Sequence, residues 1–444
     1  MLPSYRTVTP RQVGFTGRRV GEADGCSFSP DSTVSLDLLP VPSIGILKPN
    51  KRRLRGSRQG GIFMKPVRLI AFPILALGLS VVWAPCAAPA ATHTVNPGDS
   101  IQAAIDSAAA GDTVKVMPGD YVGVVAGSSA AAIRITKPIK LVAKSNPAKG
   151  KRVRILPAVG LNHGILVEPA NPGDPDVDGV TIKGFTVQGF PKNGIWLRHV
   201  KNFKIQSNES IDNLENGIWP TLSANGSVKK NVAYGSEDSA LWIEASENVR
   251  VLKNEFYNSP TGLEITISKD VTVMKNDIHH NTIGIGLYHP SAAGLPLSEA
   301  PDFLGNWKIS GNYVHDNNQP NAAPPGSMSA ALPSGGGILV LGVDNVDVSK
   351  NRIENNNFFG IAMIDYCIAV GGTSFDCTLN IPEVETSPDN NRFTSNALFG
   401  NGGDPEPGPF APFASDILAL GGTNNCFSNN TATLTIPFPL TPEC

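Results

Sequence analysis

Three of the five tryptophans in the chain, Trp196, Trp219 and Trp242, follow one another at intervals of 23 residues. Each lies two positions after a small residue, and the positions on either side of this column are mostly apolar. Because side chains alternate along a strand, we expect the apolar neighbours to point inward and the indoles outward. Indole faces suit the apolar faces of sugar rings, so this tryptophan column is a candidate platform for an extended polysaccharide.

Charged and proton-exchanging residues flank the tryptophan column. Glu264 continues the column, and Arg198, Glu244 and Tyr288 lie two residues further along their own segments, with His289 next to Tyr288. We predict that Glu244 and Glu264 contact substrate, because carboxylates bind sugar hydroxyls. Tyr288, His289 and Arg198 are the catalytic candidates for a lyase or an epimerase. Tyr288 and His289 could exchange protons beside a uronate carboxyl group, and Arg198 could bind hydroxyls or that carboxylate.

A structural alternative stays open for the tryptophan column. An outward stripe of indoles is costly to leave in water, so a loop or an N-terminal arm could cover it. Two stretches, 291–304 and 319–334, are insertions that could form such a cover. The solvent exposure of the three indoles distinguishes a binding surface from a covered one.

A second column of side chains consists of Tyr234, Tyr257, His279, His315 and Glu354. Stacked histidines could hold a metal with a carboxylate, provided that the insertion between the two histidines loops out. A polar surface ladder is the alternative, and we predict no metal ligands. No G-G-x-G-x-D repeat occurs, so calcium stays open without a supporting motif and no cofactor is required.

An internal repeat of about 23 residues must position these columns. Its first marker is an Asn, which occurs seven times. A second marker, a small residue that is mostly Gly, follows the Asn by eight or nine positions. A third marker, an Asn or Asp, precedes the first Asn by six positions. Asn tolerates left-handed backbone at tight turns, and stacked amides can hydrogen-bond from one repeat to the next. We therefore expect a structural Asn ladder at these positions: Asn208, Asn231, Asn254, Asn276, Asn312, Asn351 and Asn396.

Short alternating segments separate the markers and read as strands. The segments 249–252, 271–274 and 346–349 alternate with a period of two and are rich in β-branched residues. No helix fits within 22–23 residues beside three strands and three turns. Each repeat is then one coil of a parallel solenoid, in which equivalent residues stack.

The segment 96–116 predicts the start of the solenoid. Apolar residues at 101, 104, 105 and 108 form one face of a short helix, for which Asp99 is a suitable N-cap. Such a helix would cover the open end of the core, as terminal repeats require.

The stretch TVNPGDSIQAAIDSAAAGDTVKVMPGDY and the coils after it resemble the right-handed parallel β-helix proteins of the pectin-lyase-like superfamily. The resemblance covers residues 92–435 and implies an all-β right-handed parallel β-helix with a short N-terminal capping helix. The superfamily contains polysaccharide lyases, hydrolases, epimerases, adhesins and binding proteins, so the resemblance specifies fold rather than reaction. The R-x-P-x-x-R pattern of pectate lyases and the D-P-H-D pattern of alginate epimerases are absent.

The N-terminal 90 residues indicate export. Residues 64–90 combine a basic start at Met64, an apolar run over 69–83 and an A-x-A site that ends at Ala90, which is typical of a signal peptide. Residues 1–63 are then upstream sequence without a fold, or, alternatively, a long basic leader. We expect residues 91–444 to form one secreted or periplasmic domain without a transmembrane segment.

Four cysteines fall within this expected domain, all near its end: Cys367, Cys377, Cys426 and Cys444. In an exported protein they indicate two disulfides that staple a C-terminal cap. The local pairing, Cys367 with Cys377 and Cys426 with Cys444, is one of three, and a zinc site is the rival reading.

The charge of the expected domain excludes one class of partner. Removing residues 1–90, with 12 basic and 4 acidic residues, leaves 24 basic and 34 acidic residues, a net charge of −10. Nucleic acid is therefore disfavoured. Two functions remain. The protein binds a polysaccharide or cell-surface glycan, with or without cleaving or epimerising it, or it is a non-catalytic scaffold whose tryptophan column is covered by loops.

Overall fold

The computed structural model describes residues 89–123, 130–325, 327–370, 385–408, 410–437, 440 and 444. The chain divides into two units, residues 1–83 and 84–444, and every described residue belongs to the second unit. The predicted leader (1–63), most of the predicted signal peptide (64–90) and Cys377 therefore lie outside the described residues.

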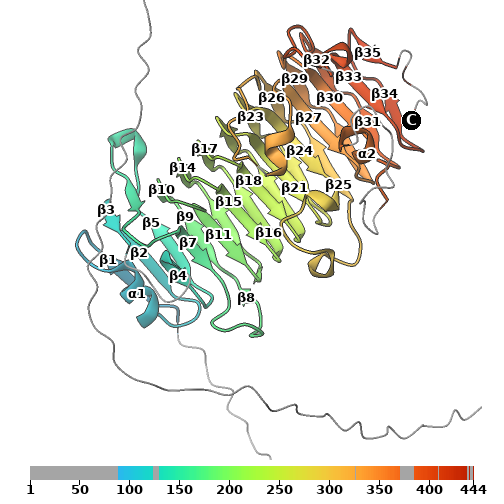
Figure 1. Ribbon diagram of the computed structural model, residues 1–444. Coiled ribbons are helices and arrows are strands. Elements are labelled where there is room, and N and C mark those ends of the chain that lie inside the picture. The colour runs from blue at the N-terminus through green and yellow to red at the C-terminus, as the bar shows by residue number, and fades with distance from the viewer. Residues whose placement is uncertain are drawn as a thin grey trace, which may run out of the picture. The chain divides into compact units, whose positions relative to one another are not determined.

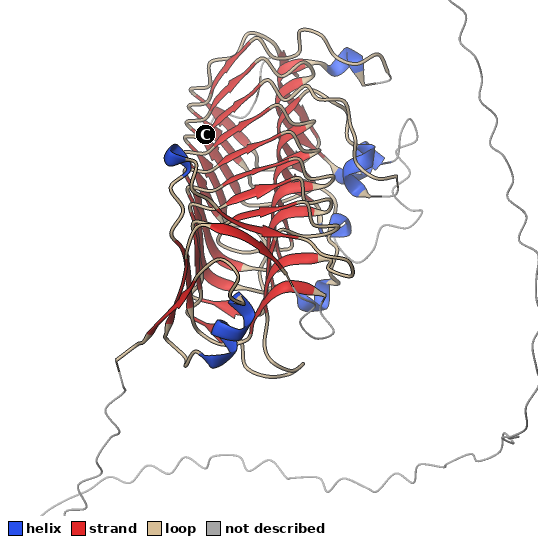
Figure 2. Ribbon diagram, turned by 90° about the vertical axis from the view of Figure 1, so that its left-hand side faces the viewer, coloured by secondary structure: helices blue, strands red, loops and turns tan. Residues whose placement is uncertain are grey.

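Three parallel sheets, called A, B and C here, contain the strands of the second unit, and the coils between the two ends contribute strands to the three sheets in turn (Figure 1). Equivalent strands of successive coils are hydrogen-bonded neighbours, and the described strands pair in parallel along all three sheets. Figure 2 shows the strands of successive coils side by side, with the short helices outside them. The predicted all-β parallel β-helix is confirmed.

Sheet A follows the order of the chain. Its main path comprises β1 (Thr92–Val95), β2 (Thr113–Val116), β5 (Lys140–Ala143), β9 (Thr181–Lys183), β13 (Lys204–Gln206), β16 (Ala224–Lys229), β19 (Glu247–Leu252), β22 (Thr272–Met274), β25 (Trp307–Ser310), β28 (Val346–Ser349), β31 (Arg392–Thr394) and β34 (Cys426–Ser428), and β8 (Val177–Asp178) and β12 (Val200–Lys201) pair beside it.

Sheet B comes next in each coil. It comprises β3 (Gly119–Val122), β6 (Val153–Leu156), β10 (Thr186–Gln188), β14 (Glu209–Ile211), β17 (Val232–Tyr234), β20 (Glu255–Tyr257), β23 (Asp277–His279), β26 (Tyr313–His315), β29 (Arg352–Glu354) and β32 (Ala397–Phe399).

Sheet C carries the tryptophan column. It comprises β4 (Ala131–Ile135), β7 (His163–Val167), β11 (Ile195–Arg198), β15 (Asn216–Thr221), β18 (Ser239–Glu244), β21 (Thr261–Thr266), β24 (Ile283–Tyr288), β27 (Gly336–Leu341), β30 (Phe359–Ile364), β33 (Ser415–Leu420) and β35 (Thr435–Ile436).

The core lies inside the coils and is lined by Val, Ile and Leu from all three sheets, for example Val251 in β19, Leu263 in β21 and Ile278 in β23. At the turn between sheets A and B, the predicted Asn ladder is present. Asn254 Nδ2 donates to Asn276 Oδ1 at 2.9 Å, and Asn254 Oδ1 accepts from the backbone N–H of Asn231 at 2.8 Å. The left-handed residue is not the ladder Asn but the residue before it, such as Lys253 with a φ of 56°.

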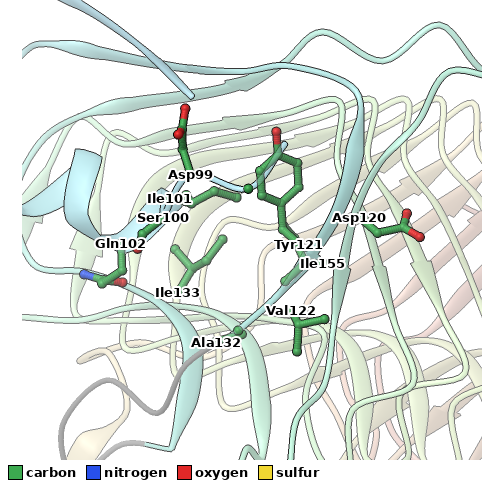
Figure 3. Close-up of a pocket in the computed structure, with 12 residues that line it drawn as sticks. Asp99, Ser100, Ile101, Gln102, Asp120, Tyr121, Val122, Ala132, Ile133 and Ile155 are labelled. Carbon is green, nitrogen blue, oxygen red and sulfur yellow. The ribbon is translucent and has the colours of Figure 1, made fainter. Parts of the chain in front are cut away.

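Helix α1 (Ile101–Ser107) confirms the predicted helical segment and corrects its N-cap. The Ser100 hydroxyl accepts from the Ala103 backbone N–H, whereas Asp99 instead accepts from the backbone N–H of Asn96. Ile101 and Ile105 are buried in the core. A cavity of about 230 Å³ lies between the start of α1, β3 and β4, with Asp99, Tyr121 and Ile133 among the residues that line it (Figure 3).

The other helices of the described residues are short and lie in turns and insertions, where they interrupt no sheet. They are α2 (Tyr366–Val370) and the 3-10 helices η2 (Pro147–Lys149), η3 (Pro290–Ala292), η4 (Leu297–Glu299), η5 (Met328–Ala331) and η6 (Ala411–Phe413). Among the described residues, no helix is long and apolar enough to cross a membrane.

One predicted disulfide is confirmed, between Cys426 in β34 and Cys444. Cys367 in α2 is also disulfide-bonded, and Cys377, its predicted partner, lies outside the described residues. The zinc alternative is therefore wrong for Cys367, Cys426 and Cys444, because a disulfide sulfur is not a thiolate ligand.

Candidate functional site

The three tryptophans form one continuous stack on the outer face of sheet C. The ring centroids of Trp196 and Trp219 lie 5.0 Å apart and those of Trp219 and Trp242 lie 5.1 Å apart, with interplanar angles of 10°. The spacing follows from the strand repeat of about 4.8 Å in a parallel sheet. His163 extends the stack at the Trp196 end, with its ring 5.0 Å away and tilted. The predicted register and outward direction are thus confirmed.

The stack covers most of its own ring faces. Both faces of Trp219 lie against neighbouring indoles, so its exposed surface consists of the ring edge. Trp196 and Trp219 are half-buried, and Trp242 is only 8% exposed. The column therefore presents a ridge of indole edges to a ligand rather than a row of separate flat faces.

The indole N–H groups point along the stack, toward the next coil. Trp196 donates to the Thr221 hydroxyl at 3.1 Å, and Trp242 donates to the Thr266 hydroxyl at 2.9 Å. At the equivalent position the N–H of Trp219 faces Glu244 and lowers the pKa of its carboxyl group. The geometry of that contact is poor, because Trp219 Nε1 and Glu244 Oε2 are both buried without a well-formed hydrogen bond.

Glu244 is the central acidic residue of this face. Its side chain is fully buried, and Oε1 accepts the backbone N–H groups of Gly294 at 2.6 Å and Leu295 at 2.9 Å. Burial raises the pKa of Glu244 to about 7, despite the two N–H groups and Trp219, which lower it. Near neutral pH the group is therefore divided between its acid and its carboxylate form.

Two further carboxyl groups lie beside Glu244. Glu264 is 3% exposed and accepts from the Ser239 hydroxyl at 2.5 Å, and Asp238 accepts from the Ser329 hydroxyl at 2.6 Å. Burial raises the pKa of both carboxyl groups, and the Asp238 charge raises that of Glu264 further. Asp238, Glu244 and Glu264 are called the carboxyl cluster below.

Both predicted cover segments fold over this region. The segment 291–304 places Gly294 against Trp242 and Glu244, where an added Cβ would lie 3.0 Å from the indole. The segment 319–334 places Ser329 on Asp238. Loops thus cover Trp242 and the carboxyl cluster, as the structural alternative predicted, whereas Trp196 and Trp219 remain partly exposed.

The three predicted catalytic residues do not lie together in one environment. Tyr288 is fully buried, its hydroxyl lies 3.3 Å from the Thr261 hydroxyl, and burial raises the pKa of its phenol well above the ordinary value. Its ring occupies the space above Gly286, where an added Cβ would lie 2.1 Å from it. Arg198 is exposed at the end of β11 and has no ion-pair partner among the described residues.

His289 has partners on both ring nitrogens. Nδ1 accepts from the backbone N–H of Ser291 at 3.1 Å, and Nε2 lies 3.0 Å from the Glu385 carbonyl oxygen, which implies the Nε2–H tautomer. The ring also stacks on Tyr366, and burial lowers the pKa of the imidazole. These contacts fix the segment after β24 and leave neither nitrogen free for a substrate.

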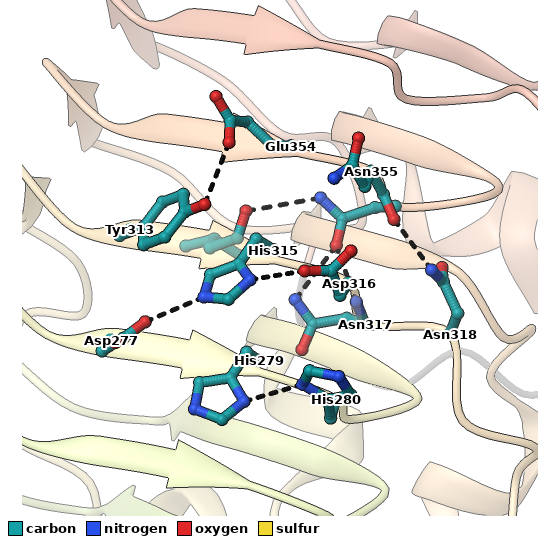
Figure 4. Close-up of polar contacts among 12 residues, drawn as sticks. Asp277, His279, His280, Tyr313, His315, Asp316, Asn317, Asn318, Glu354 and Asn355 are labelled. Atoms are coloured by element: carbon teal, nitrogen blue, oxygen red, sulfur yellow. Dashed lines mark hydrogen bonds and ion pairs between the residues drawn. The ribbon is translucent and has the colours of Figure 1, made fainter.

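The second predicted column is present on the outer face of sheet B. Tyr257 stacks on His279 at 5.1 Å, and His279 stacks on His315 at 5.0 Å, so the insertion between the histidines does loop out of the stack. His315 pairs with Asp316 and Asp277, and His279 Nδ1 faces His280 Nδ1 (Figure 4). Within the described part of the chain, no cluster of three or more ligand side chains has the geometry to hold a metal ion.

Sequence reasoning missed two residues of the sheet C site. Asp238 lies just before β18, next to the Ser239 that donates to Glu264, and the cover segment contacts it through Ser329. His163 lies at the end of the tryptophan stack, where burial lowers the pKa of its imidazole to about 4. The repeat did not reveal His163, because the strand partner of Trp196 is Leu166, so His163 does not occupy the repeated column position.

Known proteins share the fold of this chain. A family model described as a right handed beta helix region matches residues 164–299. The A-module of the mannuronan C-5 epimerase AlgE4 from Azotobacter vinelandii is similar, with 16% identity, a TM-score of 0.50 and coverage of 77% of this chain and 93% of that one. A mutant of the DFA-IIIase from Arthrobacter chlorophenolicus A6 has 14% identity, a TM-score of 0.51 and coverage of 78% and 82%.

No curated protein matches the sequence. At these identities the likeness to the two enzymes establishes the fold alone. The parallel coils, the family match and the two similar structures together identify the chain as a right-handed parallel β-helix protein.

Proposed function

We propose that the chain is a carbohydrate-active protein that binds a glycan along the tryptophan stack and acts on it at the carboxyl cluster. The observation that carries this proposal is the pair of buried, unsatisfied polar atoms, Trp219 Nε1 and Glu244 Oε2, where the stack meets the cluster. Buried polar atoms without partners are rare in proteins, and a ligand hydroxyl could satisfy both.

Acid–base cleavage of a glycosidic bond suits the carboxyl cluster. Such chemistry needs one carboxyl group that is protonated near neutral pH and a second that is ionised. The pKa of Glu264 is raised well above its ordinary value, which favours the acid form, whereas Glu244, with a pKa of about 7, supplies the carboxylate form more readily. The two similar structures are those of a mannuronan epimerase and a DFA-IIIase, which supports a carbohydrate substrate.

Tyr288 and His289 take a structural part in this proposal. Tyr288 packs against sheet C below the cover, and both nitrogens of His289 are engaged by backbone groups. The proposal therefore transfers the proton-exchanging role from these two residues to Glu244 and Glu264. Arg198 remains a candidate for binding an acidic group at the exposed end of the site.

A non-catalytic scaffold is the second candidate function. The complete burial of Glu244 and the 8% exposure of Trp242 favour it, because a substrate must displace the segment 291–304 to reach the carboxyl cluster. In a scaffold, the segment 291–304 would stay in place permanently. The two unsatisfied atoms, Trp219 Nε1 and Glu244 Oε2, would then destabilise the fold without serving a ligand.

Replacement of Trp219 tests the binding step. We expect Trp219→Ala to weaken glycan binding about tenfold, because it removes the centre of the ridge and a contact energy of about 1–2 kcal/mol. Binding is measured on a glycan array that includes mannuronan, DFA-III and uronate polymers. Tyr257→Ala, which interrupts the equivalent stack on sheet B, is the matched control and should bind as the original protein does.

Replacement of Glu264 tests the chemical step. On any glycan that the array identifies, Glu264→Gln should retain binding and lose bond cleavage, which is measured as released reducing ends. A protein that binds no glycan, or whose cleavage persists in Glu264→Gln, would contradict the proposal and favour the scaffold.

A further inference from the structure

The outer face of sheet A carries a row of side chains in which cations and hydroxyl groups alternate. Strand register brings these residues side by side, one per coil, from β5 to β31. In order along the sheet, the row consists of Lys140, Thr181, Lys204, Ser227, Arg250, Thr272, Lys308, Asp347 and Arg392.

The cations of this row are exposed and unpaired. Lys140, Lys204, Arg250, Lys308 and Arg392 all lie in the exposed class, and none has an ion-pair partner among the described residues. Because neighbouring parallel strands lie about 4.8 Å apart, cations on alternate strands are about 9.6 Å apart. The intervening hydroxyls separate the charges, which reduces their repulsion and leaves each one available to a ligand.

A second row of cations runs beside the first, at the turn between sheets A and B. Its members are exposed and occupy equivalent left-handed positions just before the ladder asparagines: Lys230, Lys253, Lys275 and Lys350. Asp347 is the one acidic side chain among the two rows. The two rows are therefore strongly basic, although residues 91–444 have a net charge of −10 and an acid outside the rows, Glu247 of β19, pairs with Lys269.

We infer that the outer face of sheet A binds a linear acidic polysaccharide, aligned with the direction in which the coils stack. A polyuronate carries one carboxylate per sugar ring, so it presents regularly repeated charges and hydroxyls to a regularly repeated row of cations and hydroxyls. This surface is separate from the tryptophan stack on sheet C, and the inference does not depend on the proposed function.

Single-stranded nucleic acid fits this face poorly. Proteins that bind it without sequence preference stack the bases on aromatic side chains. The side chains of the sheet A strands from β5 to β31 that are not buried belong to Lys, Arg, Ser, Thr, Asn, Gln, Asp, Glu, Ala, Val, Leu and Met, and none is aromatic. The ligand is therefore expected to be recognised by charge and hydroxyl groups rather than by stacking.

Charge reversal along the row tests the inference. The variant with Lys204→Glu, Arg250→Glu and Lys308→Glu should bind sodium alginate at least about tenfold more weakly than the original protein, as measured by isothermal titration at low salt. The matched control, Arg152→Glu, Arg154→Glu and Arg352→Glu, makes the same change in net charge on sheet B, where these side chains pair with acidic residues, and it should bind as before. Circular dichroism checks that all variants stay folded.

A variant that removes an acidic residue from the row should change alginate affinity in the opposite direction. Asp347→Thr gives the row a hydroxyl where the alternation has an acid, and it should tighten alginate binding two- to threefold. Equal losses in the two triple variants would overturn the inference, as would failure of the original protein to bind alginate. Binding to phosphatidylglycerol vesicles or duplex DNA but not to alginate would also overturn it and assign the face to that partner.

Discussion

Asn254→Leu is expected to destabilise the solenoid by about 4 kcal/mol or more. The Asn254 amide is buried and serves groups of the two neighbouring coils: it accepts from the Asn231 backbone N–H and side chain, and it donates to the Val228 carbonyl and to Asn276 Oδ1. Leu has a similar size but offers neither an acceptor to the buried Asn231 backbone N–H nor a donor to the Val228 carbonyl, and it removes the side-chain links to Asn231 and Asn276. Urea-induced unfolding followed by circular dichroism measures the effect.

Asn248→Gly in the same coil is the matched control. Asn248 lies on the surface, has a φ of 52°, and its side chain donates only to Asn225. Gly adopts the same left-handed backbone, so this variant should change the free energy of unfolding by less than about 1 kcal/mol. Similar effects of the two variants would show that the ladder is not a main source of stability.

The sequence predicted the ladder because one turn has the same geometry in every coil. A turn that recurs at a fixed spacing selects the same residue each time, as Asn231, Asn254 and Asn276 illustrate. A second ladder, at the turn between sheets B and C, was missed. It links Asn281, Asn317, Asn356 and Asn401, but Ser236 and Ser259 occupy the equivalent positions in two coils and break the pattern.

The register of Trp196, Trp219 and Trp242 was predictable for the same reason, since it depends only on the coil length. The orientation of the rings and the burial of Glu244 were not predictable. They depend on the segment 291–304, whose backbone N–H groups at Gly294 and Leu295 reach Glu244 from 50 residues away. A repeat pattern carries no information about where an insertion folds back, so the burial that raises the pKa of Glu244 could not be predicted.

Glu244→Gln is expected to make the protein more stable at pH 8 by about 3 kcal/mol. The pKa of Glu244 is about 7 in the folded chain, against an ordinary value of 4.5. Between these two pH values the folded chain therefore holds more protons than the unfolded chain, so stability falls as pH rises through this window. Gln cannot ionise, keeps an oxygen for the Gly294 and Leu295 N–H groups, and removes this loss.

The expected signature is a difference between variant and original protein that is small below pH 4.5, grows up to pH 7 and then stays constant. Thermal unfolding from pH 4 to pH 9 measures it, and Glu247→Gln, at an exposed position in β19, should reproduce the pH profile of the original protein. Parallel profiles for Glu244→Gln and the original protein would contradict the raised pKa. A Glu244→Gln protein that is more stable but inactive would mean that the chain retains a destabilising carboxyl group for its chemistry, because a scaffold gains nothing from that cost.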